Sequence, residues 1–132
     1  MKLYIPDSYF TTTEFACPCG CGFGSKQEDI NKDLLDKLNM MRILYGEPMV
    51  VLSGARCEEY NRSVGGVEDS AHLPHAITGQ CRAVDILVRS SSARFTLINL
   101  GLKLGITRFG LATTFLHMDV AWDLPGHVMF NY

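Results

Sequence analysis

Charged and polar side chains interrupt two otherwise apolar segments of the sequence, and their chemistry stands out. In residues 83–88, alternate aliphatic side chains share one face of an extended chain, so Asp85 lies on the opposite face. In residues 115–120 the same alternation places His117 and Asp119 together, opposite the aliphatic side chains. An acid within an apolar strand is costly unless its carboxylate is paired or binds a metal. Each segment therefore presents a potential metal ligand on the face away from the core.

A histidine in a polar loop adds a second imidazole. His72 follows Asp69-Ser70-Ala71, where no core packing calls for this side chain. Two imidazoles and one carboxylate are a known ligand set for a catalytic zinc whose fourth position is open to water. Zinc lowers the pKa of that water to roughly 7 and polarises a carbonyl group, which suits amide hydrolysis. Residue types alone do not decide between a zinc site and satisfied polar groups at strand ends, and the second is the simpler interpretation.

The elements that position these residues are predicted from periodicity and turn residues. Apolar side chains recur at helical spacing over residues 30–45, and Gly46 and Pro48 end that helix. Helices and strands follow one another without the regularity of βαβ units, so we predict the α+β class. The predicted helices are a short one begun by the capping box Thr11-x-x-Glu14, then residues 30–45, 57–63 and 90–102, and the predicted strands are residues 49–52, 83–88, 115–120 and 128–132.

The composition predicts one folded domain that comprises residues 1–132. Of the 132 residues, 47% are hydrophobic and 20% charged, which is typical of a globular chain with a single core. A net charge of −2 without a basic run argues against nucleic acid or an anionic membrane as the main partner. No apolar run approaches ~18 residues, so no membrane insertion is expected. Residues 1–7 lack the apolar stretch of a signal peptide, so we expect a cytoplasmic product unless another system exports it.

Three of the five cysteines lie close together in Cys17-Pro18-Cys19-Gly20-Cys21-Gly22. Without a secretory signal, reduced thiols are expected in place of a disulfide framework. A structural zinc site usually needs four ligands, commonly from paired C-x₂₋₄-C motifs, and no second pair follows here. A metal or redox role and a tight glycine-rich turn with small buried side chains both stay open, and we favour the turn.

Several short motifs follow one another in a fixed order along nearly the whole chain. They are Ser53-Gly54-Ala55-Arg56, Asn61, Gly65-Gly66, Ser70-Ala71-His72, Ala83-Val84-Asp85-Ile86 and Phe115-Leu116-His117-Met118-Asp119. Taken together, this series resembles the zinc D-alanyl-D-alanine carboxypeptidase family of peptidoglycan peptidases (peptidase M15), which includes phage-type endolysins. The segment Thr13-Glu14-Phe15-x-Cys17-x-Cys19-Gly20-Cys21-Gly22 is similar to the opening of its small phage-type members. The resemblance implies a small antiparallel sheet flanked by helices, the fold shared with the hedgehog signalling domain.

The resemblance also implies roles for individual residues. Carried over by position, it makes His72, Asp85 and His117 the ligands of one Zn²⁺ per chain. Arg56 would bind a carboxylate of the peptide stem, a task that suits its planar fork of donors. Asp119 would act as general base or proton shuttle, or it would orient a ligand imidazole from behind, and both roles stay open.

The loop after His72 departs from the family pattern. His72 and Asp85 are thirteen positions apart, more than in the common form, with an apparent insertion at residues 74–79. The insertion brings His75 within reach of the site as a substrate contact, a lid residue or a plain loop residue, and also as a rival metal ligand. The position directly after Ser70-Ala71 favours His72 as the ligand. Ser70 itself is expected to contact substrate or to stabilise this loop.

The function implied by the resemblance is that of a zinc metallopeptidase, a peptidoglycan hydrolase that cuts an amide bond in the peptide stem. The bond is either the D-Ala-D-Ala bond cut by a carboxypeptidase or an L-Ala-D-Glu or cross-link bond cut by an endopeptidase. The alternative is a non-catalytic module of the same fold that binds zinc and the cell wall, or a phage structural component. We expect a monomer that meets the wall after phage lysis or as part of a virion.

Overall fold

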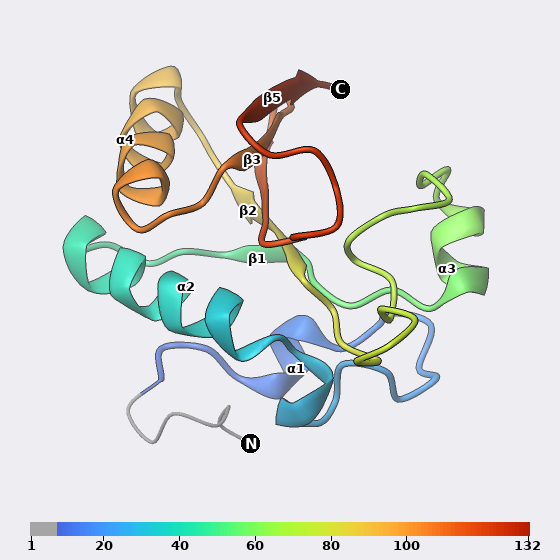
Figure 1. Ribbon diagram of the computed structural model, residues 1–132. Helices are drawn as coiled ribbons and strands as arrows, with labels where there is room; N and C mark the ends of the chain where they lie inside the picture. Colours follow the sequence, from blue (N-terminus) through green and yellow to red (C-terminus); the bar gives the residue numbers. More distant parts are fainter. Residues whose placement is uncertain (1–7) are drawn as a thin grey trace.

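The fold is a five-stranded sheet with its longest helices packed against one side (Figure 1). The computed structural model of the chain describes residues 8–132, and the predicted α+β class is confirmed. The sheet has the strand order β1-β2-β4-β3-β5. The helices are α1 Thr12–Phe15, η1 Gln27–Asp29 (a 3₁₀ turn), α2 Lys32–Tyr45, α3 Glu58–Ser63 and α4 Ser91–Lys103, and the strands are β1 Val51–Ser53, β2 Ala83–Leu87, β3 Arg108–Leu111, β4 Phe115–Asp119 and β5 Val128–Asn131.

The two central strands have the alternation that the sequence predicts. Val84 and Ile86 of β2, together with Leu116 and Met118 of β4, are buried in the main core. Successive side chains of a strand point to opposite faces of the sheet, so the residues between them face the other side. The sheet therefore presents Asp85 and its neighbours on β4 away from this core.

Most strand pairings in the described part of the chain are antiparallel, as predicted, and one is parallel. β1 pairs with β2, and β4 with both β2 and β3, in antiparallel register, whereas β5 runs parallel to β3. β4 ends beside the start of β3, and residues 120–127 keep the chain at that end of the sheet, so β5 runs along β3. β3 is absent from the predicted strands because Arg108 and Gly110 leave only two apolar residues as a signal.

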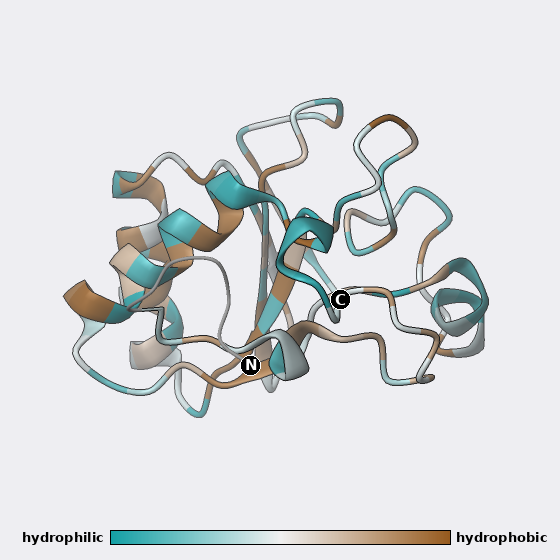
Figure 2. Cartoon of the chain, turned by 90° about the horizontal axis from the view of Figure 1, so that it is seen from below, coloured by the Kyte–Doolittle hydropathy of each residue, from teal (hydrophilic) through white to brown (hydrophobic). Residues whose placement is uncertain are grey.

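Helices α2 and α4 cover the apolar face of the sheet (Figure 1). The Asn31 side chain caps α2 by accepting a hydrogen bond from Leu34 N at 3.1 Å, and Gly46 ends it in the left-handed conformation with φ 76°. The predicted start at residue 30 is early because Ile30 forms an isolated bridge with Cys81. Hydrophilic and hydrophobic residues alternate along the turns of α2, as expected for a helix with one buried face (Figure 2), whereas the buried residues of α4 are Leu97 and Gly101. The buried apolar residues of α2 are Leu34, Leu35, Leu38 and Met41.

A long connection without helix or strand, residues 64–82, joins α3 to β2. Within it, Ala71 packs with Ala83 and Ala121 in a small second apolar cluster, separate from the main core. This cluster fixes the loop next to the ends of β2 and β4. No helix in residues 8–132 is long and apolar enough to cross a membrane.

Candidate metal centre

Two neighbouring strands and one loop bring three possible metal ligands together. β2 and β4 pair so that Asp85 lies directly opposite His117, on the face turned away from the main core. His72 Nε2 lies 3.3 Å from Asp85 Oδ1 and 3.3 Å from His117 Nδ1, and His117 Nδ1 lies 2.9 Å from Asp85 Oδ1. Each of the three residues is at most 5% exposed. The structure thus brings the three predicted ligands into one buried cluster.

Hydrogen bonds of the backbone hold the loop residue in this cluster. Arg56 N donates to His72 O at 3.0 Å, and Arg82 N donates to Ala71 O at 2.9 Å. His72 N donates to Ser70 Oγ at 3.2 Å, so Ser70 contacts the loop that carries His72. The loop is therefore tied to the strand system on both of its sides, which fixes the position of the imidazole without any regular secondary structure.

In each histidine, the ring nitrogen that points away from the cluster contacts an acceptor and therefore carries a hydrogen. His72 Nδ1 lies 2.6 Å from Gly54 O, and a carbonyl only accepts, so Nδ1 carries the hydrogen and Nε2 presents a lone pair. His117 Nε2 lies 2.7 Å from Asp119 Oδ2, a carboxylate oxygen that accepts, so Nε2 carries a hydrogen and Nδ1 is the ring nitrogen that faces Asp85 and His72. One ring nitrogen of each histidine and a carboxylate oxygen of Asp85 therefore face one another. A cation among them satisfies all three, and this donor set fits Zn²⁺.

Burial and mutual hydrogen bonds shift the pKa values of the three clustered residues. Burial raises the pKa of Asp85, but hydrogen bonds with His117 and His72 outweigh it and hold the pKa well below its usual range. Burial lowers the pKa of His72 and prevails there. Burial also lowers the pKa of His117, yet hydrogen bonds with Asp119 and Asp85 outweigh it and leave the pKa raised. Protonation of His117, which its raised pKa favours, competes with metal binding, so binding depends on pH.

Asp119 lies behind His117 and is held there by Arg108. Asp119 Oδ1 accepts hydrogen bonds from Arg108 Nε at 2.7 Å and from Ala121 N at 3.1 Å, while Oδ2 faces His117 Nε2. The register of β3 on β4 sets Arg108 opposite Asp119, which explains why these two side chains meet. Burial raises the pKa of Asp119, but the hydrogen bond with His117 outweighs it and keeps the pKa lowered. Asp119 is thus an ionised, buried carboxylate that accepts from an imidazole N–H.

Arg56 lies at the edge of the centre and binds three side chains. Its Nε donates to Ser53 Oγ at 3.1 Å, its Nη1 to Asn61 Oδ1 at 3.2 Å and its Nη2 to Asp85 Oδ2 at 3.3 Å. A guanidinium has five N–H donors, so two stay free for a ligand as far as the described residues go. A Cβ on Gly66 would lie 2.0 Å from Asn61 Oδ1, so a glycine there is what lets Asn61 reach Arg56.

His72 and His117 face a pocket of about 360 Å³. The Phe130 ring forms one wall, with its centroid 5.4 Å from that of His117. A Cβ on Gly110 would lie 2.4 Å from the Phe130 ring and 2.7 Å from the Tyr132 ring, so this glycine makes room for both rings. Partial burial raises the pKa of Tyr132 to about 12, so its hydroxyl stays protonated at neutral pH. The predicted site residues Arg56, Ser70 and Asp119 also line the pocket.

His75 lies outside this pocket. His75 Nε2 is 3.3 Å from Asp123 Oδ2, and its ring centroid is 5.0 Å from that of Trp122. Asp123 also forms an ion pair with Arg82, so the inserted loop is attached to the segment that follows β4. Within the described part of the chain, the ligand cluster on the sheet consists of His72 and two strand residues, without His75. A substrate contact by His75 stays a prediction.

Three residues that shape the centre are not predicted from the sequence: Arg108, Gly110 and Phe130. The first two lie on β3, and their alternation with apolar residues over four positions was the available signal. Phe130 lies on β5, which was predicted as a strand, but only its parallel pairing with β3 brings the ring over His117. These contacts depend on the order of the strands in the sheet.

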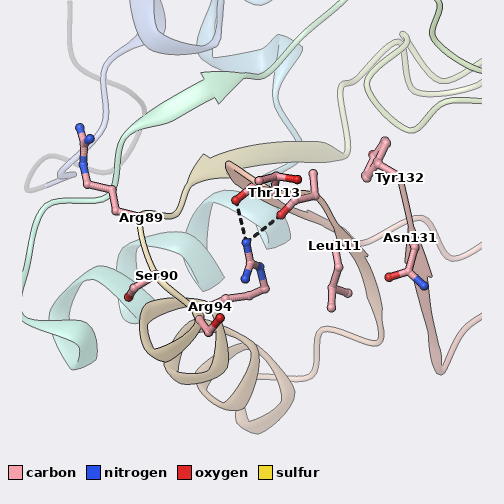
Figure 3. A pocket seen from close by; sticks show the side chains of 9 residues that line it. Arg89, Ser90, Arg94, Leu111, Thr113, Asn131 and Tyr132 are labelled. Carbon is pink, nitrogen blue, oxygen red and sulfur yellow. Dashed lines mark hydrogen bonds between the residues drawn. The ribbon is translucent and has the colours of Figure 1, made fainter.

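A second hollow, of about 500 Å³, lies between the start of α4 and the connection from β3 to β4 (Figure 3). Arg94 Nη2 donates to Ala112 O at 2.7 Å and to Thr113 O at 3.0 Å, and its guanidinium points toward this connection (Figure 3). Among the described residues that line it there is no Cys, His, Asp or Glu, so the hollow offers none of the usual metal-binding side chains. It shares Asn131 and Tyr132 with the pocket of the metal centre, so the two depressions adjoin.

The sequence that forms this arrangement also matches a known protein family. A family model described as Peptidase M15 matches residues 8–119. The matched part contains the whole histidine and aspartate cluster, together with Arg56 and Asp119. Among curated proteins, no sequence matches this chain.

Proposed function

This chain belongs to the Peptidase M15 family, and from that premise we propose that it hydrolyses an amide bond in the peptide stem of bacterial peptidoglycan with one catalytic Zn²⁺. The observation that carries the proposal is the convergence of three buried electron-pair donors, His72 Nε2, Asp85 Oδ1 and His117 Nδ1, beside an open pocket. When bound, zinc supplies a Lewis acid that acidifies water and polarises a carbonyl group. With such a substrate the protein would act at the cell wall. We expect it to reach the wall after phage lysis or as part of a virion.

The two histidines are assigned to metal binding, and in each a different hydrogen-bond acceptor holds a hydrogen on the ring nitrogen that points away from the cluster. Gly54 O holds the hydrogen of His72 on Nδ1, and Asp119 holds that of His117 on Nε2. A ligand imidazole whose outer N–H is anchored in this way keeps its lone pair aimed at the metal. The two ring nitrogens that would bind the metal are therefore already aimed at one point before any metal arrives.

Of the two roles left open for Asp119, we assign it the orientation of His117. Both of its carboxylate oxygens have partners within the protein, Oδ2 at His117 and Oδ1 at Arg108 and Ala121 N. A general base needs a free oxygen within reach of the proton it takes from substrate or water. Asp119 is 2% exposed and sits behind the ligand ring, which suits a positioning residue better than a base.

Arg56 is assigned to the binding of a substrate carboxylate. Its three internal hydrogen bonds hold the guanidinium in one orientation at the pocket, and two N–H donors stay free within the described residues. A planar guanidinium with two free donors matches the two oxygens of a carboxylate. This arrangement favours a bond close to a free C-terminus or to a D-glutamyl side chain of the stem.

The walls of the pocket suit an extended peptide better than a compact ligand. Phe130 and Tyr132 form an apolar side, and the adjoining hollow shares Asn131 and Tyr132 with it. A peptide stem that binds at the metal centre can therefore continue past Tyr132 toward the start of α4. Contact of His75 with a longer substrate stays part of the proposal, since its cluster with Asp123 borders the segment after β4.

The test is mass spectrometry of defined muropeptides incubated with the zinc-loaded protein. His117→Ala removes one ligand, and His127→Ala is a matched control because His127 is exposed and outside the ligand cluster. We expect cleavage by the intact protein and by the control, with loss of cleavage in His117→Ala. The mass of the product identifies the bond. If the zinc-loaded protein and its variants all leave every stem peptide intact, the peptidase proposal is wrong, and the non-catalytic wall-binding module takes its place.

A further inference from the structure

Four cysteines from two distant parts of the chain meet in a second cluster, which we call the thiol cluster. Cys17, Cys19 and Cys21 lie in the loop after α1, and Cys57 directly precedes α3. The Sγ atoms are 3.5 Å apart for Cys17 and Cys19, 3.8 Å for Cys17 and Cys57, and 3.6 Å for Cys19 and Cys57. All four Sγ atoms, that of Cys21 included, lie within 4.8 Å of one another.

These separations do not fit disulfides, and they do fit a shared metal ion. All four cysteines of the thiol cluster are free, and a disulfide needs S–S of about 2.05 Å. A tetrahedral zinc with Zn–S bonds of about 2.3 Å sets its sulfur atoms about 3.8 Å apart. The observed separations of 3.5, 3.6 and 3.8 Å are close to that value. Three of the four sulfur atoms therefore already have the mutual spacing of a tetrahedral coordination shell, and Cys21 Sγ lies within 4.8 Å of each of them.

The loop that carries three of these cysteines is shaped so that they converge. Gly20, Gly22 and Gly24 have φ of 82°, 96° and 87°, in the left-handed region that side chains disfavour. These reversals alternate with the cysteines and turn the loop back on itself, and Cys17 N donates to Phe23 O at 2.8 Å across it. A Cβ on Gly24 would lie 2.5 Å from Ala55 Cβ, so only glycine lets the loop approach the segment before Cys57.

Backbone N–H groups point at two of the sulfur atoms. Cys57 N donates to Cys17 Sγ at 3.5 Å, and Tyr60 N donates to Cys57 Sγ at 3.4 Å. Donors of this kind stabilise sulfur in its thiolate form, which is the form that binds metals. Four neutral thiols in mutual contact would gain little, because S–H is a weak donor and sulfur a weak acceptor.

From this geometry we infer that Cys17, Cys19, Cys21 and Cys57 bind a second Zn²⁺, separate from the ion at His72, Asp85 and His117. Soft thiolate ligands select zinc among the common divalent ions, and tetrahedral four-sulfur sites hold zinc or iron. Each thiol loses its proton when it binds, so four thiolates and one Zn²⁺ carry a charge of −2. With four protein ligands no position is open to water, and the site is structural.

The second ion would stabilise the catalytic centre through the short segment between β1 and α3. Gly54 O accepts the hydrogen bond from His72 Nδ1, Arg56 N donates to His72 O, and Cys57 follows Arg56 directly. Ala55 N donates to Phe15 O at 2.8 Å, which joins this segment to the end of α1, directly before the loop of the thiol cluster. A metal at the thiol cluster thus cross-links the part of the chain that orients His72 and Arg56.

The test measures metal content and thiolate coordination separately from activity. Protein purified under reducing conditions is expected to hold two zinc ions per chain by elemental analysis, and His117→Ala is expected to hold one. Co²⁺ loaded into His117→Ala should give the intense sulfur-to-metal charge-transfer band of thiolate coordination, with all cysteines intact. Cys19→Ser combined with Cys57→Ser should lose that band and one metal ion. Cys81→Ala is the matched control, because Cys81 is a buried cysteine outside the cluster and should change neither value.

Two results would overturn the inference. One is a single metal ion in the native protein with no thiolate band when Co²⁺ is added to His117→Ala. The other is a disulfide among the four cysteines in protein that retains its fold. Iron in place of zinc, seen in the same elemental analysis, would overturn the choice of metal. None of these readouts depends on muropeptide cleavage, so the inference and the proposed peptidase activity can fail independently.

Discussion

Replacing Asp119 by Asn tests the assignment of this residue as the group that orients His117. In the native protein, Asp119 Oδ1 accepts from Arg108 Nε and Ala121 N, and Oδ2 accepts from His117 Nε2. An asparagine has one accepting oxygen and one donating NH₂ group. If its oxygen keeps the two donors at Arg108 and Ala121, its NH₂ group faces the N–H of His117. The imidazole relieves this clash by keeping its hydrogen on Nδ1, which is the atom proposed to bind the metal.

The expected loss of zinc affinity follows from the hydrogen bond that is removed. Hydrogen bonds to charged groups contribute roughly 1.5–3 kcal/mol, and about 1.4 kcal/mol corresponds to a factor of ten. Zinc affinity at the His72, Asp85 and His117 centre should therefore fall roughly 10- to 100-fold, which is also the range for lost partners of metal-ligating histidines. The unfavourable tautomer of His117 puts the expected value at the upper end.

The assay is a competition titration against a chromophoric zinc chelator, with kcat measured at saturating zinc. Asp123→Asn is the matched control, because Asp123 also pairs with an arginine, Arg82, but lies outside the ligand cluster and is 44% exposed in its side chain. The control should bind zinc as the native protein does. The positioning role is refuted if Asp119→Asn keeps native zinc affinity and loses only kcat, which is the result that a general base predicts.

Three further substitutions follow from other contacts. Arg56→Gln keeps a polar side chain but loses the positive charge and the paired N–H donors of the guanidinium. KM for stems with a free carboxylate should therefore rise roughly 10-fold or more, whereas KM for an amidated stem should change little. Equal changes of KM for both stems would contradict the assigned role. Gly110→Ala places a Cβ 2.4 Å from the Phe130 ring, so it should displace that ring and lower kcat/KM. The overpacking should also lower the free energy of unfolding by about 1–3 kcal/mol, which thermal unfolding measures. Leu116→Ala removes a core side chain that is 0% exposed, so unfolding by urea should show a loss of about 2–5 kcal/mol without a change in zinc stoichiometry.

The faces on which Asp85 and His117 lie could be predicted because a strand repeats every two residues. Alternation alone sets Asp85 on one face of residues 83–88 and His117 on one face of residues 115–120. The apolar residues between them indicate which face meets the core, and β2 and β4 confirm both faces. The direct pairing of Asp85 with His117 was not available from the sequence, because register depends on which strands become neighbours.

Contacts between distant segments could not be predicted in the same way. A paired motif near the first three cysteines is the usual signal for a fourth ligand, whereas Cys57 is 40 residues from Cys17. Arg108 and Phe130 reach the centre only because β3 lies between β4 and β5. A sequence pattern reports local periodicity, and these residues have their roles from the order of strands in the sheet.

Of the three residues proposed to bind the catalytic metal, His72 alone lies outside a helix or strand, and this would give the thiol cluster its physical importance. The main core fills the other face, under α2 and α4, while the loop that carries His72, residues 64–82, contains no helix or strand. A catalytic centre needs ligands held to within about 0.5 Å. Small domains that lack apolar burial in a region commonly use metals or disulfides there instead. A zinc ion at the thiol cluster would supply that rigidity where the hydrogen bonds of Gly54 and Arg56 meet His72.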